Sequence, residues 1–277
     1  PKPETLVKNL EKEITQGGKP FVCLSAQKEK SMWSTQNLEN HLRKLFPNKK
    51  ILRIDSESVA DPNHEAFGSI TKLNEILSNY DIVLASPSIE TGVSIDLKKH
   101  FTAVWGIAQG VQSESSVRQS LARLREPVDR HLYVAPHGMG KVGNGSSSWQ
   151  SLIAAQNAML RANLKFLRQA DLPELSSVSD IDELENFQPE TLKCWAKMAT
   201  RHNAGLIKYD QQIFTELEAE GHKIISVEPS HDSDQVIRES LKDCRDKSYL
   251  ASREAISHAQ PFINESEIGR ASCRERV

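Results

Sequence analysis

The stretch that decides the fold is Ile82-Val-Leu-Ala-Ser-Pro-Ser-Ile-Glu-Thr-Gly-Val-Ser-Ile-Asp96, in which a short apolar run opens into a polar loop. Such a run is typical of a strand that is buried on both faces of a sheet. Four more apolar runs lie on either side of it, at residues 20–24, 51–54, 101–107 and 131–135. We therefore predict a sheet built from these five strands.

Amphipathic helices are predicted between the strands. Residues 5–15 repeat apolar side chains at helical spacing, and Gly17-Gly18 after them favours a helix end. Ser34 can cap a helix through Leu45, because its hydroxyl can accept a backbone amide proton. Strands that alternate with helices predict an α/β fold, with a parallel sheet covered on both faces. Further helices are expected at residues 67–77 and 116–124.

The carboxyl ends of parallel strands share one edge of the sheet, where ligands of such folds usually bind. The residues that follow four of the predicted strands are Ser25, Asp55, Ser86 and Gly106. We expect their loops to form a ligand edge. Ser25, Gln27 and Lys28 can contact phosphates there, although polar residues follow most strands.

The chain changes character near residue 140. Residues 137–148 are rich in glycine and serine and have almost no apolar side chains, which is typical of a linker. We expect a lobe at 1–140, a linker at 141–148 and a mainly helical accessory domain at 149–266. In that domain the pattern favours helices at 149–167, 192–198, 207–217 and 235–259, with a possible strand at 223–227. Residues 267–277 resemble a translated sequencing adapter and are left out of the predicted fold.

Composition narrows the classes of function. The chain has 277 residues, a formal net charge of -2, and 35 basic against 37 acidic side chains. This balance argues against a histone-like binder, so any nucleic-acid contact should be local. The four cysteines lack Cys-x-x-Cys spacing, so we expect reduced thiols in a cytoplasmic protein rather than zinc or disulfides. No run reaches the roughly 18 apolar residues that a membrane span needs.

A second polar stretch, Gln119-Ser-Leu-Ala-Arg-Leu-Arg125, lies between the last two predicted strands. On a helix, Gln119 and Arg123 share a face because they are four residues apart, and Arg125 projects from the helix end. A guanidinium offers a planar fork to phosphate oxygens, which favours a phosphate-binding role. The alternative is an amphipathic helix whose arginines are simply solvated.

The two polar stretches together resemble motifs V and VI of superfamily 2 helicases. With Phe101-Thr-Ala-Val-Trp-Gly-Ile-Ala-Gln-Gly-Val-Gln112 between them, they closely resemble the carboxyl-terminal helicase region of cyanobacterial-type plasmid replication proteins. That family is similar to the origin-binding helicases of herpesviruses, and its members join a primase-like region to a two-lobe motor. The resemblance implies a RecA-like second lobe of an ATP-dependent DNA helicase that starts plasmid or phage replication.

The resemblance also implies roles for single residues. Ser86 and Thr91 hold a phosphate of the DNA strand, through their hydroxyls and through backbone amides of the first stretch. The nucleotide cleft is lined by Glu90, Gly92 and Asp96, where glycine lets the backbone approach closely. The γ-phosphate is faced by Gln119, Arg123 and Arg125, whose charge stabilises the transition state.

The sequence departs from the family pattern at three positions. Pro87 removes a backbone donor, Ala122 replaces a glycine, and Glu126 replaces the last arginine, which leaves Arg125 as the second finger. Gly17-Gly-Lys19 precedes a strand and lacks the spacing of a phosphate-binding Walker A loop. We therefore expect ATP and Mg²⁺ to be bound mainly by a separate first lobe, and this chain to be inactive alone.

Other interpretations stay open on the sequence. A non-catalytic nucleic-acid-binding or scaffolding module can keep the same fold, and an unrelated doubly wound enzyme can place its ligand at the same edge. Asp182-Glu-Leu-Glu185 imitates a magnesium-binding box, but no buried strand precedes it, so a solvated helix is the better interpretation.

Overall fold

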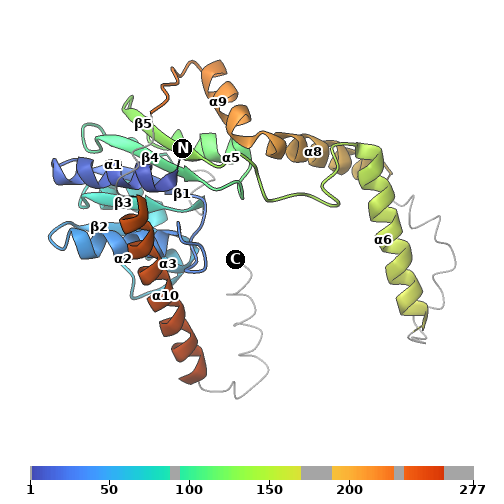
Figure 1. Cartoon of the computed structure of the whole chain (residues 1–277), viewed down its shortest axis with the longest axis horizontal. Coiled ribbons are helices and arrows are strands. Elements are labelled where there is room, and N and C mark those ends of the chain that lie inside the picture. Colours follow the sequence, from blue (N-terminus) through green and yellow to red (C-terminus); the bar gives the residue numbers. More distant parts are fainter. Residues whose placement is uncertain (1, 88–93, 170–188, 228–233, 259–277) are drawn as a thin grey trace. The chain divides into compact units, whose positions relative to one another are not determined.

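The computed structural model describes residues 2–87, 94–169, 189–227 and 234–258. Its centre is a sheet of five parallel strands in the order β2-β3-β1-β4-β5 (Figure 1). The strands are β1 (Pro20–Leu24), β2 (Ile51–Ile54), β3 (Ile82–Ala85), β4 (Ala103–Ala108) and β5 (Asp129–Val134). All five predicted strands and the α/β, RecA-like architecture are confirmed.

Helices connect the strands and make up the second half of the described chain. They are α1 (Pro3–Thr15), α2 (Thr35–Leu45), α3 (Ser56–Ala60), the 3-10 helix η1 (Ser69–Lys72), α4 (Leu73–Leu77), α5 (Glu114–Leu121), α6 (Trp149–Gln169), α8 (Pro189–Ile207), α9 (Tyr209–Ala219) and α10 (Asp234–His258). The Ser34 hydroxyl accepts the Asn37 amide proton at 3.2 Å, so the predicted cap of α2 is confirmed. The helix predicted at 67–77 is divided into η1 and α4, because the backbone of Lys72 leaves the helical region (φ -127°, ψ 34°).

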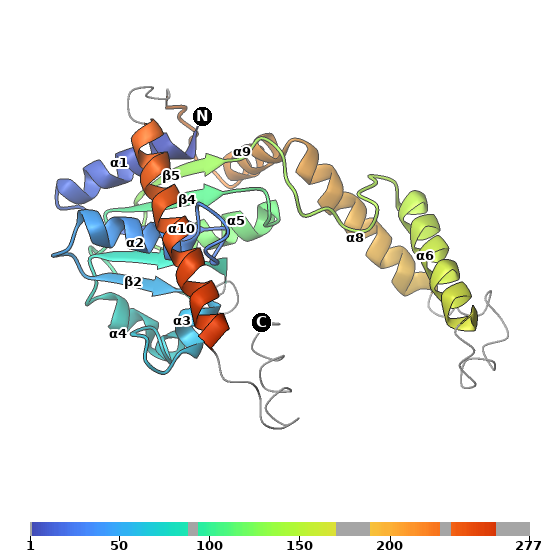
Figure 2. The same cartoon turned by 60° about the horizontal axis from the view of Figure 1, so that its bottom comes forward.

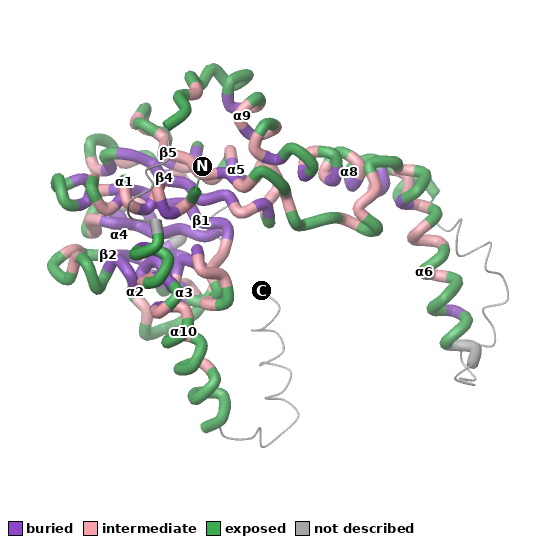
Figure 3. The backbone as a smooth tube through the Cα atoms, viewed as in Figure 1, coloured by how far each residue is buried: buried purple, intermediate pink, exposed green. Residues whose placement is uncertain are grey.

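The sheet is buried because its central strands are apolar on both faces. Every residue of β1, β3 and β4 is buried, and Figure 3 shows these strands in the colour of buried residues. One core cluster lies between the sheet and the helices α1, α2 and α10. Leu10, Leu38 and Trp105 belong to it, and burial of each such side chain contributes about 1.5–3 kcal/mol.

Helix α10 packs against α1 and α2, although it follows the helical second half of the chain (Figure 2). Its Ile237 and Leu241 enter the core cluster. His41 of α2 links the three helices, with Nε2 2.6 Å from Glu11 of α1 and Nδ1 2.9 Å from Ser240 of α10. The sequence suggested one accessory domain at 149–266, whereas the contacts group α10 with the sheet.

The other face of the sheet carries α5, which approaches it closely at Gly106. Gly106 lies inside β4 and not after it, which corrects its predicted place in the ligand edge. A Cβ at this position would lie 2.7 Å from Leu132 Cδ1 and 3.0 Å from Leu121 Cδ2. Glycine is therefore required here by packing between the helix and the sheet.

A second compact unit is formed by residues 110–114 and 135–223. Its glycine-rich segment, predicted as a linker, is held against α8 by the buried side chain of Asn203. Asn203 accepts the Val142 amide proton at 2.8 Å and donates to the carbonyls of Val142 and Ser146, both at 3.0 Å. Gly143 and Gly145 have φ of 59° and 78°, so these glycines provide left-handed turns in a fixed segment.

Three other predictions differ from the structure or are not covered by it. Residues 223–227, predicted as a possible strand, are irregular, and no strand partner is found for them in the described part of the chain. The acidic stretch Asp182–Glu185 and the residues 267–277 lie outside the described residues. None of the described helices combines the length and the apolar character that crossing a membrane requires.

Candidate functional site

Ser25 follows β1 at the carboxyl edge of the sheet, and its hydroxyl is engaged within the protein. It donates to the Ile107 carbonyl at 2.9 Å and accepts the Gln109 amide proton at 3.2 Å. The side chain is also buried. The Ser25 hydroxyl therefore ties the ends of β1 and β4 together, and its proton is already used.

Ser86 and Lys28 lie at the same edge in different environments. Ser86 follows β3, is buried, and donates its amide proton to the Ile54 carbonyl at 2.9 Å. Lys28 lies on the loop after β1 and is exposed, so its ammonium can reach an anion in solvent. The predicted residues Glu90, Thr91 and Gly92 lie outside the described residues.

A buried polar network at this edge was only weakly indicated by the sequence. Asp55 is fully buried and caps α3, where its carboxylate accepts the Ser58 amide proton at 2.8 Å. It also accepts the Thr35 hydroxyl proton at 2.7 Å and pairs with Arg53 at 2.5 Å. These donors satisfy both buried oxygens of the carboxylate. The role of Asp55 is therefore structural, and it does not bind a ligand at this position.

The two helicase-like stretches meet in the structure. Ile95 and Leu124 form a parallel bridge, in which Ile95 donates its amide proton to the Arg123 carbonyl at 2.9 Å. Arg125 in turn donates its amide proton to the Ile95 carbonyl at 3.1 Å. Both bridging side chains are buried, so the bridge is anchored in the core. The end of the first stretch, at Ile95, is therefore fixed against the turn of the second stretch.

Asn74 of α4 holds the loop of Asp96 in place. No sequence motif predicts this role of Asn74. Its Oδ1 accepts the Asp96 amide proton at 2.9 Å, and its Nδ2 donates to the Ser94 carbonyl at 3.3 Å. The Ser94 hydroxyl donates to the Asp96 carboxylate at 3.0 Å. The carboxylate is thereby oriented from its own loop and stays exposed to solvent.

Arg125 lies beside Asp96 in an open position. Its guanidinium is 3.8 Å from the Asp96 carboxylate, and the two side chains are 67% and 58% exposed. An ion pair that is this long and this exposed contributes little to stability. The Arg125 guanidinium can therefore exchange this contact for a stronger anion.

Arg123 and Gln119 do not share a helical face as predicted. Helix α5 ends at Leu121, so Arg123 lies in the turn that follows, and Gln119 is exposed on the helix. Arg123 is partly buried, and its charge reaches Cys23 in β1. Burial raises the pKa of the Cys23 thiol to about 12, while the charges of Arg130 and Arg123 lower it. Of the two arginines predicted as fingers, Arg125 is the more exposed.

Arg130, at the start of β5, fixes the loop that carries both arginines. Its guanidinium donates to the carbonyls of Leu121, Leu124 and Val128 at 3.3, 3.0 and 2.8 Å. Burial lowers the pKa of Arg130. The sequence could not predict this role of Arg130, because the role depends on how the loop at residues 121–128 folds back onto β5.

Glu126, one of the positions where the sequence departs from the helicase pattern it resembles, makes a structural contact. Its carboxylate accepts the Lys99 amide proton at 2.7 Å. Lys99 has a left-handed backbone (φ 57°), which is uncommon for a residue other than glycine. The Glu126 carboxylate thus supports a strained turn, and it joins the two loops a second time.

The predicted site residues are divided between two edges of the sheet. Ser25, Lys28 and Ser86 follow strands and so lie at the carboxyl edge. The paired loops at residues 94–100 and 123–128 precede β4 and β5, so they lie near the amino ends of those strands. The single ligand edge expected from the sequence is therefore replaced by two separate groups of residues.

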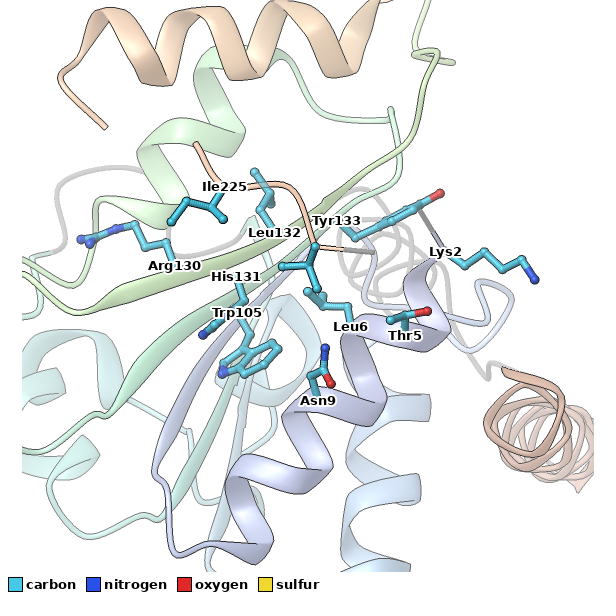
Figure 4. A pocket seen from close by; sticks show the side chains of 11 residues that line it. Lys2, Thr5, Leu6, Asn9, Trp105, Arg130, His131, Leu132, Tyr133 and Ile225 are labelled. Atoms are coloured by element: carbon cyan, nitrogen blue, oxygen red, sulfur yellow. The ribbon is translucent and has the colours of Figure 1, made fainter. Parts of the chain in front are cut away.

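A cavity of about 130 Å³ lies between α1 and β5, and none of the predicted site residues lines it (Figure 4). The rings of Trp105 and His131 stack on its wall with centroids 4.1 Å apart. Trp105 Nε1 donates to Glu13 at 2.5 Å, so the indole nitrogen is satisfied within the protein. This arrangement is typical of aromatic packing at a sheet edge.

No family model matches the chain. Among curated proteins, an uncharacterized protein of Picosynechococcus sp. is 38% identical over 264 residues. The match covers 93% of this chain and 25% of that protein, so the chain spans about a quarter of the length of the relative. A match of this extent runs through both compact units.

Proposed function

We propose that this chain is the second, RecA-like lobe of an ATP-dependent DNA helicase that takes part in starting plasmid or phage replication. The observation that carries the proposal is the bridge between Ile95 and Leu124, which joins the loops of the two helicase-like stretches. A RecA-like parallel sheet also supports it, because ligands of such sheets bind at the carboxyl ends of the strands, where Ser86 and Lys28 lie.

In this proposal ATP and its Mg²⁺ are held mainly by a first lobe, and this chain supplies positive charge. Arg125 is the main finger, because its guanidinium is exposed and only loosely paired. Arg123 supports it from the adjoining turn, and Asp96 lines the cleft with Glu90 and Gly92. A guanidinium fork neutralises charge that develops on the γ-phosphate, which lowers the barrier to hydrolysis.

DNA is held at the other edge of the sheet in this proposal. Ser86 binds a backbone phosphate there, and Lys28 adds a charge that solvent can reach. Thr91, expected to bind the same phosphate, lies outside the described residues. We no longer assign Ser25 to this role, since its hydroxyl proton is used by the Ile107 carbonyl. Closure of the lobes on ATP and reopening after hydrolysis move the DNA contacts along the strand, and we place this activity in the cytoplasm.

The test uses a full-length protein that carries this chain together with its first lobe. DNA-stimulated ATP hydrolysis and strand separation are measured for the wild type and for Arg125→Ala, with Arg253→Ala as an exposed control on α10. A motor requires hydrolysis in the wild type and the control, and a large loss in Arg125→Ala. Hydrolysis that is equal in all three proteins favours a non-catalytic scaffolding module.

A further inference from the structure

Helices α6 and α8 carry an unusual distribution of charge for a chain that is nearly neutral. Residues 135–169 contain four basic and no acidic side chains, and residues 189–208 contain four basic and one acidic side chain. Helix α10 contains five of each kind. Residues 170–188 between these helices contain six acidic and no basic side chains, so the second unit as a whole is not basic. The positive charge is confined to α6 and α8 themselves.

The basic side chains of α8 line up on one face. Lys193, Lys197 and Arg201 are each four residues apart, so they form a single stripe along the helix. Lys197 and Arg201 are exposed, and Lys193 is half-buried. We call these three residues the α8 basic face. The residues Ala196, Ala199, Asn203 and Leu206 are buried on the side of α8 that packs within the unit.

This spacing works against the stability of the helix. Like charges four residues apart repel each other on a helix surface, and the α8 basic face contains two such pairs. In the described part of the chain no ion pair is found for Lys193, Lys197 or Arg201. On α10, in contrast, Lys247 pairs with Asp243 at 2.8 Å. Local repulsion of this kind is expected where a ligand supplies the opposite charge.

We infer that the α8 basic face binds the sugar-phosphate backbone of nucleic acid. A row of cations along one helix matches a polymer that carries regularly repeated negative charges, and such contacts hold the backbone independently of base sequence. A membrane surface is the less favoured partner, because interfacial helices insert an exposed apolar face. Ala196, Ala199 and Leu206 of α8 are buried in its own unit. Met198 and Ile207 are exposed, but they are nine residues apart and lie on opposite sides of the helix, so they do not form one apolar face.

This binding surface lies in the second unit and does not depend on the proposed ATP chemistry. The Arg125→Ala variant is therefore expected to bind nucleic acid as the wild type does. Failure of the ATPase proposal leaves the inference standing. Equal binding by the α8 variant and the wild type overturns the inference alone and leaves the DNA contacts proposed for the sheet unit standing.

The test measures binding of the whole chain to a fluorescent single-stranded oligonucleotide by anisotropy, between about 50 and 200 mM salt. The test variant is Lys193→Gln, Lys197→Gln and Arg201→Gln combined. Glutamine keeps a similar helix propensity and removes the charge. The matched control combines Lys242→Gln, Lys247→Gln and Arg253→Gln, which removes two lysines and one arginine from exposed positions of α10.

We expect the α8 variant to bind about tenfold or more weakly at the lowest salt, with a salt slope smaller by about 2, because three phosphate contacts are lost. The control should keep the affinity and the slope of the wild type. Circular dichroism verifies the helix content of both, and the double variant Lys197→Gln with Arg201→Gln serves if the triple variant is unfolded. Equal losses in variant and control, no binding by the wild type, or preference for anionic vesicles or polyglutamate would each overturn the inference.

Discussion

Arg130 illustrates how one side chain fixes the geometry of a loop. A guanidinium presents several donors in a rigid plane, whereas an ammonium is a point charge on a flexible stem. Arg130 uses this plane to reach the carbonyls of Leu121, Leu124 and Val128, which surround the turn of Arg123. The positions of Arg123 and Arg125 thus depend on the contacts that Arg130 makes with their loop.

We predict that Arg130→Lys destabilises the sheet unit by about 1 to 2 kcal/mol, since charge-assisted hydrogen bonds are lost and the site is partly screened by solvent. Urea unfolding is the measurement. The exposed Arg253→Lys should leave the midpoint unchanged. An Arg130→Lys protein as stable as the wild type would show that the charge suffices without the planar fork.

Cys23 gives a second prediction at the scale of one residue. Burial raises the pKa of its thiol to about 12, and its Sγ lies 3.5 Å from the Ser120 carbonyl. We expect iodoacetamide near pH 8 to label the exposed Cys194 and to spare Cys23 until the protein is unfolded. Mass spectrometry of labelled peptides distinguishes the two, and equal labelling in the folded state would contradict the burial.

The same pKa shift makes stability depend on pH. The folded pKa lies above the ordinary thiol value of 9.0, so the thiol of the unfolded chain ionises first as pH rises. The contribution of Cys23 is complete below that unfolded value and declines as pH rises toward 12. Cys23→Ala should remove this part of the alkaline loss of stability.

At the scale of elements, the glycine-rich segment before α6 is fixed by one buried amide. Asn203 satisfies three backbone groups of this segment at 2.8 to 3.0 Å. Gly138 allows the close approach, because a Cβ there would lie 2.1 Å from Leu206 Cδ2. Glycines that the sequence indicated as a linker are thus needed for contact with α8.

We predict that Asn203→Ala destabilises the second unit by about 2 to 3 kcal/mol, because buried backbone groups lose their partners. In the same variant, the backbone amides of residues 141–148 should exchange their hydrogens faster than in the wild type. Asn163→Ala, at an exposed position of α6, is the matched control and should leave both unchanged. Slow exchange of the segment in Asn203→Ala would mean that it is fixed by other contacts.

The strands could be predicted from the sequence, and much of the site could not. Buried parallel strands are continuous apolar runs bounded by polar turns, so residues 20–24 and 82–85 were found with correct bounds. Asn74 and Arg130 carry no motif, and their roles arise from contacts between distant segments. The end of α5 before Arg123 was missed because boundaries respond to tertiary contacts, here the bridge at Leu124.

At the scale of the whole molecule, the order of segments along the chain predicts one division into domains, and the contacts between segments give another. Helix α10 returns to the sheet through Ile237 and Leu241, although the intervening residues belong to the second unit. A helical pattern shows which face is apolar but not which partner covers it. The proposed motor lobe therefore includes α10 among its structural elements.

The separation of the predicted residues into two groups also belongs to this scale. Lys28 and Ser86 lie at the carboxyl edge of the sheet, and Arg125 lies near the amino ends of β4 and β5. In the proposed motor, DNA and nucleotide are therefore bound by different parts of one rigid sheet. In such a layout, hydrolysis of the nucleotide at one edge can be coupled to a displacement of the DNA strand at the other.

The most direct test of the central claim is the kcat of DNA-stimulated ATP hydrolysis in Arg125→Ala, measured in a full-length protein with both lobes and compared with Arg253→Ala. We predict that kcat falls by a factor on the order of 10³ in Arg125→Ala, with KM nearly unchanged, because the finger acts mainly in the transition state. A kcat within about twofold of the wild type, beside an equally active Arg253→Ala control, would contradict the assignment of Arg125 as an arginine finger.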